Sequence, residues 1–321
     1  MSPLIGFTLQ ERHFAGGAEQ LQSTLLEIEG SGIDFVSVLD HLTFWDGAGF
    51  DGLANAAAVA AAHPRIPISI TVLILPVRHP VIVARQICSI ALLAPGRLTL
   101  GVGVGGEDRH EIEAAGVDPS TRGGRMNESL TVLRALLDEG EVTFAGEHFD
   151  VRSVRVRPVP TSRIPILVGG RSEAALRRTA RLGDGWLAFA CSPERFTAAT
   201  LSIRTEAEQH GRGDIEFDHG LVVWCGYSDH ACGPSPLARE MESLYKIPFD
   251  RFAKYCFEGS PGDVAKHLAD YADAGCGRFS IIPVGDSIQD EIRCVSETGH
   301  ELRRLVQTAA HRRDASEPER I

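Results

Sequence analysis

The sequence predicts a (β/α)8 barrel, and three observations lead to this fold class. Short apolar runs alternate with amphipathic stretches along almost the whole chain, which is the pattern of parallel strands joined by crossover helices. Eight such runs are present. The chain has 321 residues, a length at which barrels of this kind form one domain.

Several predicted strands are almost continuously apolar, which indicates burial on both faces. The strands are expected at Leu4–Leu9, Phe35–Leu39, Ser69–Leu75, Leu98–Val104, Pro165–Gly169, Gly185–Phe189, Gly220–Gly226 and Phe279–Pro283. The helices between them are expected at Glu19–Ser31, Asp51–Ala62, Val81–Leu93, Gly124–Glu139, Ser172–Leu182, Pro193–His210 and Pro261–Ala274. A last amphipathic helix is expected at Gln289–Ala310. We therefore expect one barrel domain over residues 1–312 and a frayed polar tail over 313–321.

Two segments interrupt the repeat. Residues 141–160 predict a hairpin insertion, with strands at Val142–Phe144 and Phe149–Val156 around the turn Ala145-Gly146-Glu147. Residues 228–255 contain several prolines and no clear periodicity, so we expect a long loop or lid there. The apolar residues in and beside this segment are compatible with a pocket lining or with a plain packed loop. They are Tyr227, Met241, Tyr245 and Phe249.

Composition excludes several function classes. The formal net charge is −11, which argues against a nucleic-acid partner, because such partners are bound mainly through Lys and Arg. The start lacks a signal-peptide pattern, and no apolar run is long enough to span a membrane, so we expect a soluble, cytoplasmic protein without a membrane partner. The seven cysteines are scattered without a C-x-x-C pair, which favours reduced, buried thiols over a metal site.

Chemistry in a barrel of this type lies at the carboxyl ends of the strands. The second strand ends in Asp40-His41, with Trp45 shortly after. A His beside a carboxylate can donate or accept a proton near neutral pH, and an indole can wall off a flat ring. The alternative is a His that only hydrogen-bonds a loop.

The fourth strand leads into a glycine-rich segment. Gly101, Gly103 and Gly106 spell G-x-G-x-x-G, but the acidic residue that a dinucleotide site needs about 20 residues later is absent from the sequence there. The glycines, with Gly105, instead let backbone approach a planar ring or permit tight barrel packing. Of the charged residues that follow, Glu107 is expected to face the site. His110, Glu111 and Glu113 are expected on a solvated helix face.

The fifth strand ends in Gly169-Gly170-Arg171-Ser172, directly before a helix. Ser172 fits the N-cap position, the glycines expose backbone N–H groups, and Arg171 adds positive charge. Together with the helix amino terminus these features predict a phosphate cradle. The alternative is a capped turn with a surface arginine.

Five segments, taken together, resemble the luciferase-like flavin- and F420-dependent oxidoreductases. They are Arg97–Glu107, Arg122–Glu128, Gly146–Phe149, Val168–Ser172 and Ala180–Trp186. The resemblance is strong over Leu4–Trp186 and weaker at Gly259–Val264. It implies a (β/α)8 TIM barrel, often dimeric, that binds FMN or the deazaflavin coenzyme F420. It also implies a bulge in the third strand near Thr71-Val72-Leu73, often with a non-proline cis peptide, which supports the cofactor ring.

The Asp40-His41 pair with Trp45 resembles the deazaflavin-dependent dehydrogenases within that family. We therefore hypothesise hydride exchange between F420 and a small organic substrate. His41 is expected to transfer the proton, Asp40 to orient it, Trp45 to wall the pocket, and Glu107 to assist as an acid. Gly103, Gly105, Gly106, Gly169, Gly170, Arg171, Ser172 and the third-strand bulge are expected to hold the cofactor.

Two other hypotheses remain open. The first is an FMN-dependent monooxygenase, which a separate reductase supplies with reduced flavin. The second is a barrel that binds a cofactor without turnover. In each case we expect a small-molecule ligand, a homodimer, and a flavin or F420 reductase as the partner that supplies reduced cofactor.

Overall fold

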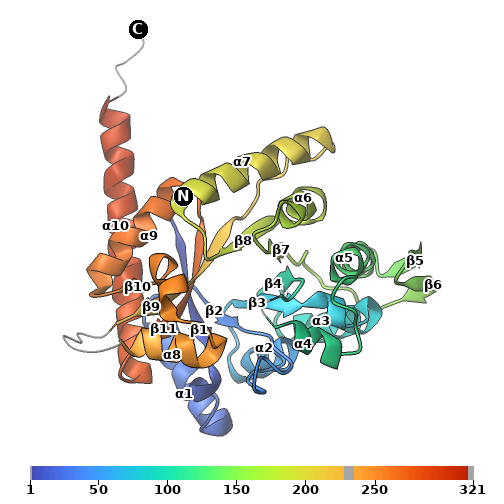
Figure 1. Cartoon of the computed structure of the whole chain (residues 1–321), viewed down its shortest axis with the longest axis horizontal. Coiled ribbons are helices and arrows are strands. Elements are labelled where there is room, and N and C mark those ends of the chain that lie inside the picture. The colour runs from blue at the N-terminus through green and yellow to red at the C-terminus, as the bar shows by residue number, and fades with distance from the viewer. Residues whose placement is uncertain (1, 107, 228–234, 317–321) are drawn as a thin grey trace.

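The computed structural model describes residues 2–106, 108–227 and 235–316. Its main sheet has nine strands, and eight of them close into a parallel barrel because β8 pairs with β9 (Figure 1). The barrel strands are β1 (Leu4–Leu9), β2 (Phe35–Val38), β3 (Ile68–Ile74), β4 (Leu98–Gly103), β7 (Ile166–Gly169), β8 (Gly185–Phe189), β9 (Gly220–Gly226) and β11 (Arg278–Val284). The predicted fold class is confirmed, and each predicted strand lies within one or two residues of an observed one.

Helices surround the barrel in the predicted order. They are α1 (Gly17–Gly30), α2 (Gly52–Ala62), α3 (Pro80–Leu93), α5 (Arg122–Asp138), α6 (Glu173–Leu182), α7 (Pro193–Gln209), α9 (Pro261–Asp273) and α10 (Ile288–Ser316). Side-chain caps fix several starts: the side chains of Asp51, Ser192 and Ser260 accept the N–H three residues later. The helix α10 passes the expected domain boundary at residue 312, so a frayed tail does not begin at 313.

The predicted hairpin is confirmed as β5 (Glu141–Ala145) and β6 (Asp150–Arg155), which extend away from the barrel beside α5 (Figure 1). Glu128 on α5 fixes its turn, because its carboxylate accepts the N–H groups of Glu147, His148 and Phe149 at 2.8–3.0 Å. These bonds lower the pKa of Glu128 against the opposing effect of desolvation. The turn therefore depends on a charge from the neighbouring helix.

The segment predicted as a loop or lid contains a helix, α8 (Pro236–Tyr245), followed by two 3-10 turns at Phe249–Arg251 and Ala253–Tyr255. The expectation of an irregular segment is therefore wrong for α8. Ser235 caps this helix and Pro236 occupies its first turn, where the missing N–H costs nothing. The two-residue strand β10 (Phe257–Glu258) then pairs with β9. Residues 228–234 of the predicted lid lie outside the described residues.

The core lies inside the barrel and between the barrel and its helices. All six described cysteines are free thiols, and five of them are buried. Burial raises the pKa of Cys191 to about 11 and that of Cys256 to about 12. Cys232 lies outside the described residues. Within the described ranges, no helix is long and apolar enough to cross a membrane.

Candidate functional site

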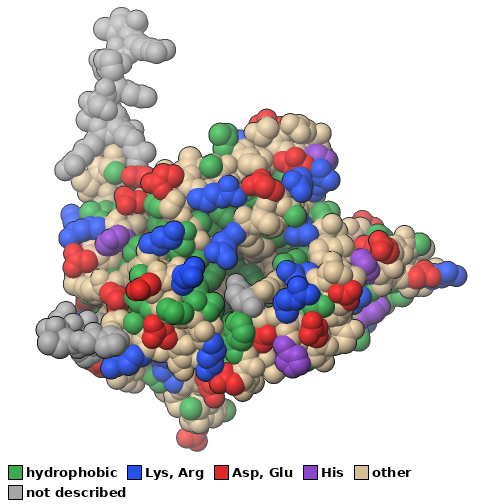
Figure 2. Space-filling model, viewed as in Figure 1, with side chains coloured by type: hydrophobic (Ala, Val, Ile, Leu, Met, Phe, Trp, Pro, Cys, Tyr) green, Lys and Arg blue, Asp and Glu red, His purple; other side chains and the backbone are tan. Residues whose placement is uncertain are grey.

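A large cavity opens at the carboxyl ends of the strands, with a volume of about 1930 Å³. Figure 2 shows a hollow near the middle of this face, with hydrophobic side chains inside it and Lys and Arg side chains around it. The segments after β2, β3, β4 and β7 and the helix α8 form its walls. The chain therefore brings most of the predicted strand ends to one site.

The third strand carries the expected bulge. The register of β3 with β4 shifts between Ile70 and Leu73, and the Thr71–Val72 peptide bond is cis. Both Thr71 and Val72 line the cavity. The assignment of Leu73 to the cofactor site is wrong, because its side chain is fully buried in the hydrophobic core. The bulge turns two successive side chains toward the cavity and the next one away from it.

Thr71 offers an unsatisfied polar atom in this wall. The residue is 5% exposed, and its hydroxyl oxygen has no hydrogen-bond partner among the described residues. A buried hydroxyl without a partner costs free energy unless a ligand or water pairs with it. The position beside Val72 in the cavity therefore fits the polar edge of a ring-shaped cofactor.

The glycines of β4 and β7 make room for Val72. A Cβ atom on Gly103 would lie 2.6 Å from Val72 Cγ2, and one on Gly169 would lie 3.0 Å from Val72 Cγ1. Tight packing against Val72 therefore accounts for glycine at position 103, and Gly103 also lines the cavity. Gly106 differs, because a Cβ atom there would meet nothing within 4 Å. Gly105 and Gly106 line the cavity as expected.

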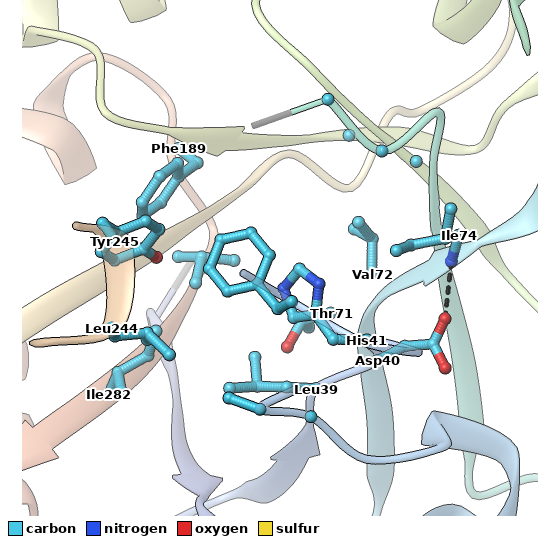
Figure 3. Close-up of a pocket in the computed structure, with 18 of the residues that line it drawn as sticks. Leu39, Asp40, His41, Thr71, Val72, Ile74, Phe189, Leu244, Tyr245 and Ile282 are labelled. Carbon is cyan, nitrogen blue, oxygen red and sulfur yellow. Dashed lines mark hydrogen bonds between the residues drawn. The ribbon is translucent and has the colours of Figure 1, made fainter. Parts of the chain in front are cut away.

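His41 lies in the cavity (Figure 3), and its partner is Glu111. The His41 Nδ1 atom is 3.1 Å from a Glu111 carboxylate oxygen. Glu111 is 1% exposed and also accepts the backbone N–H of Leu42 at 2.6 Å. The expectation that Glu111 lies on a solvated helix face is therefore wrong. An Nδ1–H bond to this carboxylate leaves Nε2 of the neutral ring as a proton acceptor.

Asp40 does not orient His41, although the two residues are adjacent. The Asp40 carboxylate accepts the N–H groups of Gly52 and Ile74, each at 2.8 Å, and forms an ion pair with Arg78 at 2.8 Å. Figure 3 shows the bond to Ile74 on the side of Asp40 turned away from His41. The predicted role of Asp40 is therefore wrong, because its charge fixes the β2 and β3 strand ends to each other.

Phe44 and Phe50, and not Trp45, are the aromatic residues of this loop that line the cavity. The Phe44 ring lies 4.2 Å from the His41 ring, centroid to centroid. Trp45 is 37% exposed, has a left-handed backbone with φ of 51°, and packs edge-on against Phe44. The predicted role of Trp45 as a pocket wall is therefore wrong. Glu107, the predicted auxiliary acid, lies outside the described residues.

The predicted phosphate cradle faces the cavity. Gly169, Gly170, Arg171 and Ser172 all line it, and the Ser172 hydroxyl accepts the N–H of Ala175 at 3.2 Å as the N-cap of α6. Gly170 has a φ of 124°, which favours glycine. The first N–H groups of a helix have no acceptor within it, so the start of α6 can receive an anion.

Arg122 and Arg178, for which no site role is predicted from the sequence, line the cavity and add positive charge beside this turn. Arg178 is 7% exposed and donates to Asn127 at 2.7 Å and to the carbonyl of Gly123 at 3.3 Å. Neither arginine forms an ion pair with a carboxylate in the described part of the chain. Desolvation, and then the charge of Arg177, lowers the pKa of Arg178, which an anionic ligand would reverse.

The wall opposite this turn is apolar. Phe189, Leu244, Tyr245 and Ile282 line it, and Figure 3 shows Tyr245 and Phe189 on one side of His41 and Val72 on the other. The Tyr245 hydroxyl accepts a hydrogen bond from Trp224 Nε1 at 3.3 Å. The site therefore combines a proton-transferring His, a bulge with a buried hydroxyl, an anion-binding turn and an apolar wall.

Comparison with known proteins agrees with this arrangement. The model of the luciferase-like monooxygenase family matches residues 5–231. An uncharacterized protein of Mycobacterium tuberculosis is 36% identical over 170 residues, which cover 53% of this chain and 58% of that protein. An F420-dependent glucose-6-phosphate dehydrogenase of Kineococcus radiotolerans is 26% identical over 300 residues, which cover 84% of this chain and 88% of that enzyme.

Solved structures show the same fold. An F420-dependent secondary alcohol dehydrogenase with an F420-acetone adduct superposes with a TM-score of 0.81 at 18% identity, covering 94% of this chain and 99% of that one. The 3,6-diketocamphane monooxygenase of Pseudomonas putida, in complex with FMN, superposes with a TM-score of 0.73 at 14% identity, covering 94% and 99%. The family match over most of the chain is the decisive finding. The chain therefore belongs to the luciferase-like monooxygenase family.

Proposed function

We propose that this protein is an oxidoreductase that uses the deazaflavin coenzyme F420 to exchange a hydride with a small organic substrate. The observation that carries the proposal is the His41–Glu111 pair, with His41 Nδ1 on a buried carboxylate and Nε2 left to accept a proton. Hydride removal from an alcohol also releases the hydroxyl proton, so this reaction needs a base beside the reacting carbon.

The residues of the cavity fit such a coenzyme. Thr71 and Val72 supply a polar atom and an apolar support for a ring, and Gly170 to Ser172 with Arg178 supply an anion site for its phosphate. When bound there, the coenzyme supplies the hydride acceptor or donor. The protein supplies the rest: His41 accepts the proton at Nε2, and Glu111 holds the ring in the required tautomer.

Relatives favour the deazaflavin over FMN. Several proteins that this chain resembles over most of their length are named F420-dependent glucose-6-phosphate dehydrogenases. The FMN-dependent monooxygenase is the second candidate, since an FMN-bound monooxygenase shares the fold. A base such as His41 is required for alcohol oxidation and is not required to form an oxygen adduct on a flavin. A barrel that binds its cofactor without turnover is the third candidate.

Titration of the purified protein with oxidised F420, beside a matched titration with FMN, tests the cofactor assignment. We expect saturable binding of F420, followed by its fluorescence, and much weaker binding of FMN. Binding of FMN alone would favour the monooxygenase. Oxygen uptake with reduced FMN would then be the next measurement.

The variant His41→Ala tests the chemistry. We expect turnover to fall by about 10²- to 10⁴-fold, the usual contribution of a general base. The dissociation constant for F420 should change little, because the phosphate and ring contacts remain. Unchanged turnover would remove His41 from the mechanism.

The homodimer and the F420 reductase partner stay predictions. A measurement of the mass in solution tests the homodimer, and an assay coupled to an F420 reductase tests the partner.

A further inference from the structure

The cavity beside His41 contains a pocket of apolar side chains, which we call the apolar pocket. It consists of Phe44, Phe189, Leu244, Tyr245 and Ile282, contributed by four separate segments of the chain. Phe44 lies against His41, and Tyr245 meets Phe44 edge-on with ring centroids 5.7 Å apart. Any group that reaches His41 Nε2 from this side is surrounded by apolar surface.

Two cations that line the cavity near this pocket, Arg12 and Lys246, have carboxylate partners within the chain. Arg12 pairs with Glu291 at 2.6 Å and with Glu240 of α8 at 3.0 Å. Lys246, at the end of α8, pairs with Asp46 of the loop after β2 at 2.9 Å. These pairs leave Arg12 and Lys246 with less attraction for an anion.

The opposite wall of the cavity carries positive charge that no carboxylate of the described residues neutralises. Arg122 and Arg178 line the cavity next to the α6 turn, and neither has a carboxylate partner within the residues that the structure describes. The proposed function assigns this wall to the phosphate of the coenzyme. This wall then serves the phosphate of the coenzyme and not a phosphate on the substrate. Arg239 of α8 also lines the cavity, but its side chain is exposed.

We propose that the substrate is an uncharged, mainly apolar secondary alcohol, or the corresponding ketone, and not a sugar phosphate. This inference rests on the proposed function and names its substrate class. In the oxidation, the C–H bond of the carbinol carbon breaks and its electron pair and hydrogen leave as hydride to oxidised F420. The O–H bond breaks, its proton passes to His41 Nε2, and a C=O bond forms. Reduced F420 and the ketone are the products.

The room available allows a substrate larger than 2-propanol beside the coenzyme. Pockets that hold one ligand usually measure about 300 to 1,000 Å³. The cavity measures about 1930 Å³, so space beyond the coenzyme remains. Each additional buried methylene group contributes about 0.8 kcal/mol, so larger apolar alcohols gain binding energy that 2-propanol lacks.

Kinetics with three probes test this inference. With saturating oxidised F420, we expect kcat/KM for 1-phenylethanol to exceed that for 2-propanol by at least about tenfold. Glucose 6-phosphate should be a poorer substrate than either alcohol. A preference for glucose 6-phosphate over 1-phenylethanol would overturn the inference and leave the F420-dependent function standing.

Two variants test whether the apolar pocket causes the preference for 1-phenylethanol. Leu244→Lys places a charge in the apolar pocket and should lower the ratio of kcat/KM for 1-phenylethanol to that for 2-propanol by at least about tenfold. A smaller amount of folded enzyme lowers both kcat/KM values by the same factor, so it does not change their ratio. The double variant Arg239→Ala, Lys246→Ala should leave kcat/KM for 1-phenylethanol unchanged. If the wild type oxidises glucose 6-phosphate and the double variant does not, Arg239 and Lys246 bind a substrate phosphate. That result would contradict the inference.

Calorimetry with acetophenone gives a readout that does not depend on turnover. We expect acetophenone to bind the free protein and the F420-loaded protein, and Leu244→Lys to weaken both interactions. If F420 itself does not bind, the proposed function fails while the acetophenone titration still measures the pocket. Failure of acetophenone to bind either form would overturn the apolar substrate class.

Discussion

The indole N–H of Trp186 donates to the carbonyl oxygen of Gly170 at 2.7 Å. Trp186 is 1% exposed and belongs to β8, whereas Gly170 belongs to the turn between β7 and α6. The bond therefore fixes the backbone of the proposed phosphate cradle from the neighbouring strand. A strand residue outside the cavity thus controls the geometry of a ligand-binding turn.

Trp186→Phe should weaken F420 binding by roughly 2- to 10-fold, because one hydrogen bond contributes about 0.5–1.5 kcal/mol. The turnover number at saturating F420 should change little, since the variant leaves His41 and Glu111 in place. Fluorescence titration of each variant with F420 measures the effect. Trp224→Phe is the matched control, because its indole bonds Tyr245 on the opposite wall. Equal loss of affinity in both variants would contradict the assigned role of Trp186.

Glu111→Gln should lower kcat by roughly 10- to 100-fold, since a hydrogen bond to a charged group contributes about 1.5–3 kcal/mol. The amide keeps the size of the side chain but removes the charge that holds His41. The dissociation constant for F420 should stay within about twofold, which separates positioning from a loss of fold. Glu113→Gln, on the same helix but 53% exposed, is the control. Wild-type kcat in Glu111→Gln would remove this carboxylate from the mechanism.

Arg178→Met should weaken F420 binding by roughly 10- to 100-fold, because charge-assisted contacts to phosphate contribute about 1.5–3 kcal/mol. Binding of the deazaflavin without its phosphate should change much less, and the two titrations together locate the effect. Arg177→Met is the control, since Arg177 is the exposed neighbour on the same helix. An equal loss for both ligands would place the effect on folding and not on the phosphate.

Because burial favours the neutral form of His219, we expect the folded protein to lose stability in mild acid. Burial, and then the charge of Arg204, lowers its pKa from 6.5 to about 4, and its Nδ1 accepts the N–H of Trp186 at 3.2 Å. Between these two pH values the unfolded chain binds the proton and the folded chain does not. The stabilisation is therefore present above pH 6.5 and is lost as the pH falls toward 4.

Urea unfolding at about pH 7.5 and about pH 4.5 measures this loss, which should be about 1–3 kcal/mol smaller in His219→Asn than in the wild type. Asn retains an acceptor for the Trp186 amide and does not titrate. His110→Asn serves as the control, because His110 is 75% exposed. The same acid-induced loss in His219→Asn and the wild type would contradict the prediction.

The barrel could be predicted because local sequence carries its signal. The apolar runs at Leu4–Leu9 and Gly185–Phe189 coincide with β1 and β8, and the caps at Asp51 and Ser172 fix helix starts. The helix α8 was not predicted, because its prolines and its short amphipathic stretch resemble a loop. Its Pro236 in fact occupies a first turn, where proline is well tolerated.

The site could be predicted only where one segment supplies it. His41 and the turn Gly169 to Ser172 stand at strand ends, and the structure places both in the cavity. The partner of His41 could not be predicted, because it follows β4 and the sequence offers several acidic residues there. Asp40 was the nearest carboxylate in sequence, but Arg78 and two backbone N–H groups already bind it. Which of several carboxylates binds His41 therefore depends on tertiary contacts that the local sequence does not reveal.

Isotope tracing follows the hydride from the substrate to the deazaflavin. The protein is incubated with oxidised F420 and 1-phenylethanol that carries deuterium on the carbinol carbon, and the reduced coenzyme is analysed by mass spectrometry. We expect the deuterium to appear in reduced F420, acetophenone to form in equal amount, and no oxygen to be consumed. Reduced F420 without deuterium, or product formation that requires reduced FMN and oxygen, would contradict it.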